Sequence, residues 1–172
     1  MDSTSLGLLV LRLVVGLTMA AHGAQKVFGW WSGPGIGGWT AAMERMRFRP
    51  ARFFAWLSAA AELIGGLLLA VGLLTPLAAA VLVGQSAVII GHVHGPKGFW
   101  NRNSGFEFPL ALVGGAVSIG LIGAGALSVD AAIGLRFDDA VRAALLVVGA
   151  LGGIAALAVP RLAKKEDSAT AG

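Results

Sequence analysis

Long apolar segments dominate this sequence and restrict what the chain can fold into. A helix that crosses a lipid bilayer needs about 20 mostly apolar residues. The segments that meet or approach this length are residues 6–28, 53–74, 77–93, 106–127 and 140–159. Only 13% of the 172 residues are charged, against about 25% in a typical soluble domain. The sequence therefore predicts an all-α integral membrane protein.

The residue types that are missing also exclude functions. The chain has no cysteine, so it cannot supply a thiolate nucleophile, a disulfide or the thiolate ligands of an iron–sulfur cluster. Its net charge of +4 would suggest nucleic acid in a soluble protein. Here the basic residues lie at the ends of apolar segments, so we expect membrane lipids and no nucleic acid as partners. The first segment is too long for a signal peptide and lacks a basic start, so we do not expect cleavage.

The distribution of basic residues predicts the topology. With five spans, most of the 13 Lys and Arg residues fall on one side of the membrane. That side holds Lys26, Arg45, Arg47, Arg49, Arg52, Lys97, Arg102, Arg161, Lys164 and Lys165. The other side holds Arg136 and Arg142, and Arg12 lies within the first span. Because basic loops stay in the cytoplasm, we expect the N-terminus outside and the C-terminus inside.

Two segments outside the spans have patterns of their own. Between residues 38 and 48, apolar side chains recur at helical spacing (Trp39, Ala42, Met43 and Met46). This periodicity predicts an amphipathic helix on the membrane surface, and a loop with a single helical turn is the alternative. Residues 161–172 are charged and then small and polar, which is typical of a disordered tail.

Small residues recur within the apolar segments at spacings that favour close helix packing. Examples are Gly16 with Ala20, Gly65-Gly66, and Gly149 with Gly153. Lipid supplies no hydrophobic drive between helices, so small residues that let backbones approach are enriched at their contacts.

Polar side chains inside the apolar segments are the candidate functional groups. A charge at mid-membrane costs about 2.5–3.5 kcal/mol on insertion scales, so it needs a partner or a cavity. At about 1.5 Å per residue, Glu62 lies roughly 14 Å into its helix, near the midplane. The polar residues expected in the same leaflet are His22, Gln25, Lys26, Glu62, His92, His94 and Glu107. Arg12 lies toward the other leaflet, and we expect it to form a structural ion pair with Glu62.

The chemistry of these side chains favours a quinone over a metal. A quinone headgroup needs hydrogen-bond partners at two carbonyls and a proton route, which histidine, lysine and glutamate can supply. The candidate cofactor-binding residues are His22, Gln25, Lys26, Glu62, His92 and Glu107. Haem ligation by His22 with His92 or His94 is disfavoured because only their depths match. His92 and His94 face different sides of a helix, so no metal site is predicted. The alternative is a structural role: Lys26 can snorkel to the interface, and His22 can serve a helix contact.

A series of short motifs resembles the DoxX family. In order they are Leu11-Arg12-Leu13, His22-Gly23-Ala24-Gln25-Lys26-Val27-Phe28-Gly29, Gly33-Pro34-Gly35, Ala61-Glu62-Leu63-Ile64-Gly65-Gly66, Gly72-Leu73-Leu74-Thr75-Pro76, Gly105-Phe106-Glu107-Phe108-Pro109-Leu110 and Leu127-Ser128-Val129-Asp130. The resemblance covers about residues 6–132 and implies a four-helix membrane bundle. The resemblance implies that six polar residues occupy positions of the family's motifs: Arg12, His22, Gln25, Lys26, Glu62 and Glu107. Residues 138–160 depart from the family pattern and predict an additional C-terminal transmembrane helix.

The resemblance also implies a function. The family is similar to the membrane subunit of thiosulfate:quinone oxidoreductase, and some members are associated with oxidative-stress complexes in the bacterial inner membrane. We therefore expect a quinone-interacting membrane subunit of an oxidoreductase or stress-response complex, with soluble redox partners and a homo- or hetero-oligomeric assembly. The alternative is a non-catalytic membrane anchor or assembly factor that recruits soluble enzymes. A transporter is disfavoured because the sequence has neither an internal repeat nor a broken mid-span helix.

Overall fold

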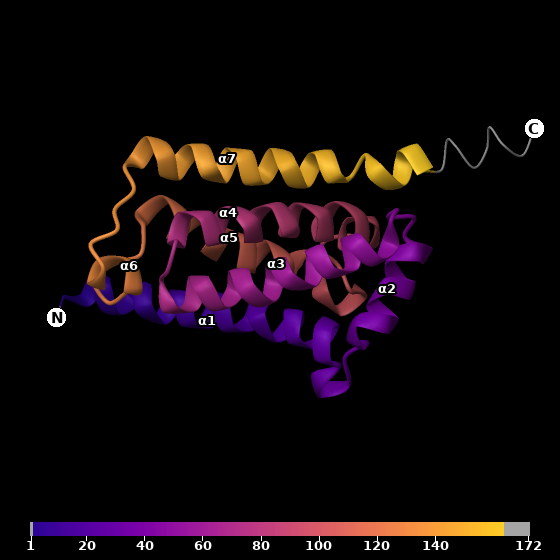
Figure 1. Cartoon of the computed structure of the whole chain (residues 1–172), viewed down its shortest axis with the longest axis horizontal. Coiled ribbons are helices and arrows are strands. Elements are labelled where there is room, and N and C mark those ends of the chain that lie inside the picture. Colours follow the sequence, from indigo (N-terminus) through magenta and orange to yellow (C-terminus); the bar gives the residue numbers. More distant parts are fainter. Residues whose placement is uncertain (1, 164–172) are drawn as a thin grey trace, which may run out of the picture.

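The computed structural model describes residues 2–163, and this part of the chain is a bundle of long helices without strands. The N-terminus and the end of the last helix lie at opposite ends of the bundle (Figure 1). The long helices are α1 (Ser3–Phe28), α3 (Ala51–Val71), α4 (Thr75–Val88), α5 (Glu107–Ile122) and α7 (Asp139–Ala156). The shorter elements are η1 (Trp30–Ser32), α2 (Gly35–Arg45), the π-helical η2 (Ile89–His94), η3 (Gly95–Lys97), η4 (Asn101–Asn103) and α6 (Val129–Ala132).

The lengths of these helices suit a bilayer. In the described part of the chain, four helical stretches are long and apolar enough to cross a membrane: Ser3–Phe28, Ala51–Val71, Thr75–Lys97 and Asp139–Ala163. Helix α5 is also apolar but has only 16 residues. Many large apolar side chains lie on the outside, such as Val14 on α1 and Val148 on α7. The predicted all-α membrane bundle is thereby confirmed.

The turn between α3 and α4 lies earlier than the sequence predicts. We expected Thr75 and Pro76 to form it, but they begin α4 instead. Proline fits the first helical turn because its missing N–H has no partner there in any case. Helix α3 ends at Gly72, which adopts a left-handed φ of 71° and donates its N–H to Leu68 O at 2.9 Å. Glycine adopts this conformation without steric cost.

Two further helix boundaries differ from the prediction. The fourth span was expected to continue to residue 127, but α5 ends at Ile122 because Gly123 takes a φ of 97°. The third span continues beyond α4 as the π-helical turn η2, Ile89–His94. Such wide turns interrupt the regular helical register and often occur at functional sites.

Glycines allow very close contacts between two pairs of helices. A Cβ atom at Gly16 on α1 would lie 2.6 Å from Gly66 O on α3, and one at Gly66 would lie 2.5 Å from Gly16 O. On α7, a Cβ atom at Gly149 would overlap the carbonyl of Ala80 on α4. A Cβ atom at Gly153 would lie equally close to the carbonyl of Gly84 on α4. These contacts confirm the predicted role of small residues and attach α7 firmly to α4.

The predicted surface helix at 38–48 is present as α2, but it begins and ends three residues earlier. Its apolar side packs on the bundle, where Met43 is buried together with Phe48 and Ala55. Helix α2 lies at the end of the bundle opposite the N-terminus (Figure 1). Its position at a membrane surface remains a prediction.

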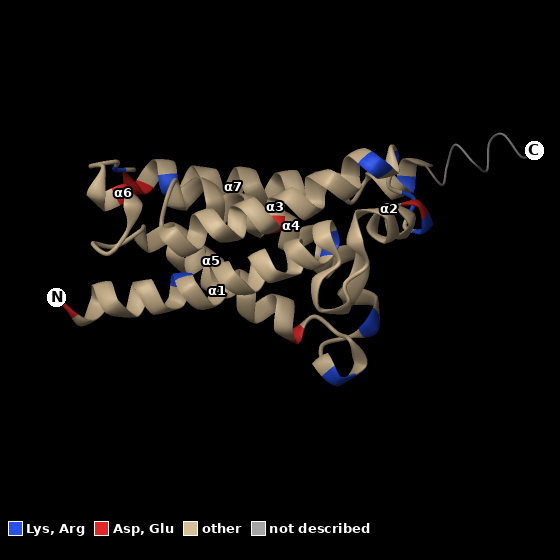
Figure 2. Cartoon of the chain, turned by 60° about the horizontal axis from the view of Figure 1, so that its bottom comes forward, with Lys and Arg blue, Asp and Glu red and all other residues tan. Residues whose placement is uncertain are grey.

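The charged residues are distributed unevenly along the bundle. Lys and Arg gather at the end that holds α2 and the C-terminal end of α7 (Figure 2). This agrees with the asymmetry on which the predicted topology rests. The predicted disordered tail falls mostly on residues 164–172, which lie outside the described residues.

Candidate functional site

Glu62 on α3 forms the centre of the candidate site. Its side chain is only 1% exposed. Its Oε1 atom lies 2.5 Å from Nζ of Lys26, near the end of α1. A charge buried this deeply needs a counter-charge, and Lys26 supplies it. The predicted pairing of Glu62 with Arg12 is therefore wrong.

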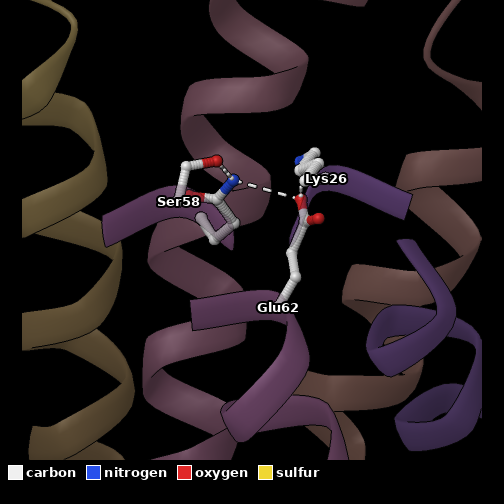
Figure 3. A network of polar contacts seen from close by, with 4 residues as sticks. Lys26, Ser58 and Glu62 are labelled. Atoms are coloured by element: carbon white, nitrogen blue, oxygen red, sulfur yellow. Dashed lines mark hydrogen bonds and ion pairs between the residues drawn. The ribbon is translucent and has the colours of Figure 1, made fainter. Parts of the chain in front are cut away.

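A network of polar side chains holds this carboxylate in place. Gln85 on α4 donates from Nε2 to Glu62 Oε1 at 3.1 Å and to Ser58 Oγ at 2.7 Å. Figure 3 shows Lys26 and Glu62 facing each other, with Ser58 on the far side of the linking amide. On α2, the ring of Trp39 lies 4.4 Å from Nζ of Lys26, a cation–π distance. Four helices thus contribute to one network around Glu62.

A cavity of about 290 Å³ opens beside this network. Its walls come from α1, α2, α3, α4, α5 and η2 and are mainly apolar. The lining residues are Met19, His22, Lys26, Trp39, Glu62, Ser86, Ile89, Val93, His94, Phe108, Pro109 and Leu112. Two buried polar atoms among them, Glu62 Oε2 and Trp39 Nε1, have no hydrogen-bond partner in the described part of the chain. Since buried polar groups are nearly always hydrogen-bonded, these two atoms leave the site with one donor and one acceptor that the described residues do not satisfy.

The structure brings only part of the predicted site together. His22 lines the cavity and contacts Phe108 edge-on, with ring centroids 6.0 Å apart. His94 lines it too, with Nδ1 2.6 Å from Ser104 O. Together with Lys26 and Glu62, these histidines line one cavity, so four of the seven polar residues expected in one leaflet lie around the same space.

Three predicted residues lie elsewhere. His92 lines a neighbouring pocket and contacts Phe48, because positions two apart along the η2 turn project in different directions. Gln25 packs against the turn at Gly33. Glu107 accepts a hydrogen bond from the backbone N–H of Asn101 at 2.9 Å and so fastens the loop before α5.

Arg12 belongs to a second buried cluster near the other end of the bundle. It is 1% exposed and donates to the carbonyls of Ala124 and Leu127, in the loop after α5. Asp130 lies in the same region, is 3% exposed and carries the opposite charge. The Asp130 carboxylate also accepts the backbone N–H groups of Leu74 and Thr75 at 2.8 and 2.9 Å, at the start of α4. Arg12 and Asp130 therefore fasten three segments of the chain together.

Sequence reasoning assigned no role to several residues that complete these clusters. Trp39 and Phe108 line the cavity, and Ser58 and Gln85 support Glu62. Gln85 could have been found from the sequence, because it is a polar residue within an apolar segment. Ser58, Trp39 and Phe108 gave no such signal, because serine is common within helices and aromatic residues are common at membrane interfaces. Asp130 stood in a recognised motif but outside the predicted spans.

The polar network can be tested without touching the cavity. Gln85→Leu is expected to lower the free energy of unfolding by about 1–3 kcal/mol, because Ser58 and the buried carboxylate each lose a hydrogen bond. Adding Ser58→Ala should recover part of this loss, since it removes the stranded hydroxyl. Denaturation in detergent micelles, followed by circular dichroism, measures both. Additive losses in the double variant would contradict the network.

Comparison with known proteins supports the family assignment. A family model for DoxX matches residues 7–95, a segment that contains Arg12, His22, Lys26 and Glu62. No curated protein and no solved structure matches the chain. The match covers more than half of the sequence, and the apolar helices fit a protein that crosses the membrane several times. The chain belongs to the DoxX family and is a multi-pass membrane protein.

Proposed function

We propose that this chain is a quinone-binding membrane subunit of an oxidoreductase, with the headgroup in the cavity beside Glu62. The observation that carries the proposal is that two residues lining this cavity each hold a buried polar atom without a partner, one a donor and the other an acceptor. Trp39 Nε1 can donate to a quinone carbonyl, and Glu62 Oε2 can accept from a quinol hydroxyl. The cavity volume of about 290 Å³ lies just below the range typical of small-molecule pockets, about 300–1,000 Å³.

The remaining lining fits the same ligand. Met19, Leu112 and Phe108 provide apolar contact for a ring, while His22 and His94 stand at the cavity wall. Lys26 donates from Nζ to Glu62 Oε1, and this contact fixes the orientation of the carboxylate. A bound quinone would supply the electron-carrying chemistry. Because the chain has no cysteine, any thiol chemistry must come from a soluble partner protein.

The proposal includes a cellular setting. We place the chain in a bacterial inner membrane, with the N-terminus outside and the basic end that holds α2 in the cytoplasm. In this orientation the cavity lies in the cytoplasmic leaflet, where a soluble redox partner can approach the loops around it.

Trp39→Phe provides a sharp test, because it removes the indole N–H but keeps an aromatic ring over Lys26. Loss of one hydrogen bond is expected to weaken the binding of a short-chain ubiquinone or menaquinone analogue about fivefold. Isothermal titration of the purified protein in detergent measures this. Trp56→Phe is the matched control, since Trp56 is exposed on α3 and does not line the cavity.

Two further variants decide between the proposed function and its alternative. His22→Ala should also weaken analogue binding, because it removes part of the cavity wall. Glu62→Gln should weaken it by replacing one carboxylate oxygen with a donor. If all of these variants bind the analogue like the wild type, the cavity is not a quinone site. Retained partner capture and activity in cells would then favour a non-catalytic membrane anchor.

A further inference from the structure

An open apolar groove lies on the outside of the bundle between α3 and α7. Helix α4 packs against both of these helices and lies between them. The groove has a volume of about 390 Å³, and small residues such as Ala61, Gly84 and Gly152 line much of it. Its lining on α4 extends from Leu77 to Val88, roughly 16 Å at about 1.5 Å per residue. This is close to the hydrocarbon thickness of one leaflet, about 15 Å.

A basic pocket lies near the groove at the end of the bundle that holds α2. A small apolar cavity lies between them, because it shares Leu57 and Ala156 with the groove and Met46 and His92 with the pocket. The pocket has a volume of about 320 Å³. Its lining residues are Arg45, Met46, Arg47, Gly91, His92, Leu157, Pro160 and Arg161. Within the described residues, this lining includes arginines from two separate segments and no acidic side chain.

We propose that an anionic phospholipid binds here, with its phosphate between Arg45 and Arg161 and one acyl chain in the groove. Arginine matches phosphate oxygens well because its planar guanidinium offers several donors in a fixed geometry. Basic pockets between transmembrane helices bind anionic headgroups in the same way. A zwitterionic headgroup would bring its own cation against the arginines, and a free phosphate would leave the groove unused. Charge and shape therefore select a lipid with a net negative headgroup.

The basic pocket and the groove have no lining residue in common with the proposed quinone cavity, although the small cavity between them shares Trp39, Ile89 and Val93 with it. Variants of the two sites can therefore be compared in the same protein, and the failure of one proposal leaves the other standing.

The headgroup is tested by measuring lipid binding to the purified full chain with native mass spectrometry. Phosphatidylglycerol is expected to bind more tightly than phosphatidylcholine with the same acyl chains. Arg45→Gln together with Arg161→Gln should weaken phosphatidylglycerol binding roughly 25-fold, at about fivefold for each basic residue. The matched control is Lys97→Gln with Arg102→Gln, which removes the same charge from a loop that does not line the pocket.

Several results would overturn the headgroup assignment. They are equal affinity for the two lipids, an equal loss in the control variant, and inorganic phosphate alone raising the melting temperature as much as the lipid does. The last result would assign the pocket to a soluble anion.

The groove is tested by filling it. A Cβ atom at Gly152 would meet nothing within 4 Å, so Gly152→Leu places a side chain in the groove without displacing a helix. It should weaken phosphatidylglycerol binding several-fold and leave the melting temperature of the lipid-free protein unchanged. Gly114→Leu is the control, because Gly114 on α5 is equally unobstructed and lies outside the groove. Unchanged binding in the Gly152 variant would remove the acyl-chain site and overturn the proposal.

Discussion

Replacing Arg12 with methionine is expected to lower the free energy of unfolding by about 3–5 kcal/mol, because two carbonyls each lose a hydrogen bond to a charged group, worth about 1.5–3 kcal/mol. Methionine preserves an extended apolar side chain but removes the charge and the donors. The carbonyls of Ala124 and Leu127 then lose their partner, and Asp130 stays buried without its counter-charge. Denaturation in detergent micelles measures the loss.

Arg142→Met is the matched control for this prediction. Arg142 also donates to a carbonyl at the end of α5, that of Ile122, but its acidic partner Asp139 is 92% exposed. Exposed ion pairs contribute only about 0–1 kcal/mol, so the control should lose little. In addition, Arg12→Met combined with Asp130→Asn should cost less than the sum of the two single changes, since the two opposite charges belong to one buried cluster. An Arg12 variant as stable as the control would contradict the structural role of this cluster.

Gly23→Val is expected to destabilise the bundle by about 3 kcal/mol, at the upper end of the usual cost of overpacking. A Cβ atom at Gly23 on α1 would overlap the backbone nitrogen and Cα of Leu63 on α3. Rigid backbone cannot rotate away, so the two helices must separate. Because Glu62 precedes Leu63, this separation should also lengthen the contact between Lys26 and Glu62. The expected result is lower stability together with weaker binding of the quinone analogue.

Gly7→Val controls for the change in helix propensity. Gly7 lies on the same helix, but a Cβ atom there would meet nothing within 4 Å. Substitutions at such surface positions usually change stability by less than about 0.5 kcal/mol. If both variants lose the same stability, the cause is the helix itself and not the contact between α1 and α3.

The helices could be predicted from the sequence because the free energy of placing a segment in lipid depends mainly on its own residues. This explains why the positions of α1, α3 and α7 were nearly correct. The errors arose where a single backbone conformation decided the outcome, as at Gly72 and Gly123, which end α3 and α5 before their apolar segments end. The π-helical turn η2 left no sign in the composition, since its residues continue an apolar segment.

The candidate site was predictable only in part. Depth along each helix placed His22, Lys26 and Glu62 at one level, and the structure brings all three to one cavity. Depth does not determine which neighbouring helix a side chain faces, and for this reason the partner of Glu62 was wrong. The sequence analysis paired Arg12 with Glu62 because this acidic residue is expected at the most similar depth in the membrane. The partners of Arg12 instead lie in a loop more than 100 residues further along the chain.

By itself, the sequence determined that this chain enters a membrane as several helices and that a few polar groups must be buried there. Both results follow from local properties: the apolar length of each segment and the identity of its side chains. Only the tertiary structure decided which of these groups meet. Lys26 reaches Glu62 because glycines let α1 and α3 approach closely, and Arg12 is held by the carbonyls of Ala124 and Leu127 because the loop after α5 folds back against α1. Such pairings depend on the rotation and separation of whole helices, which no single segment encodes.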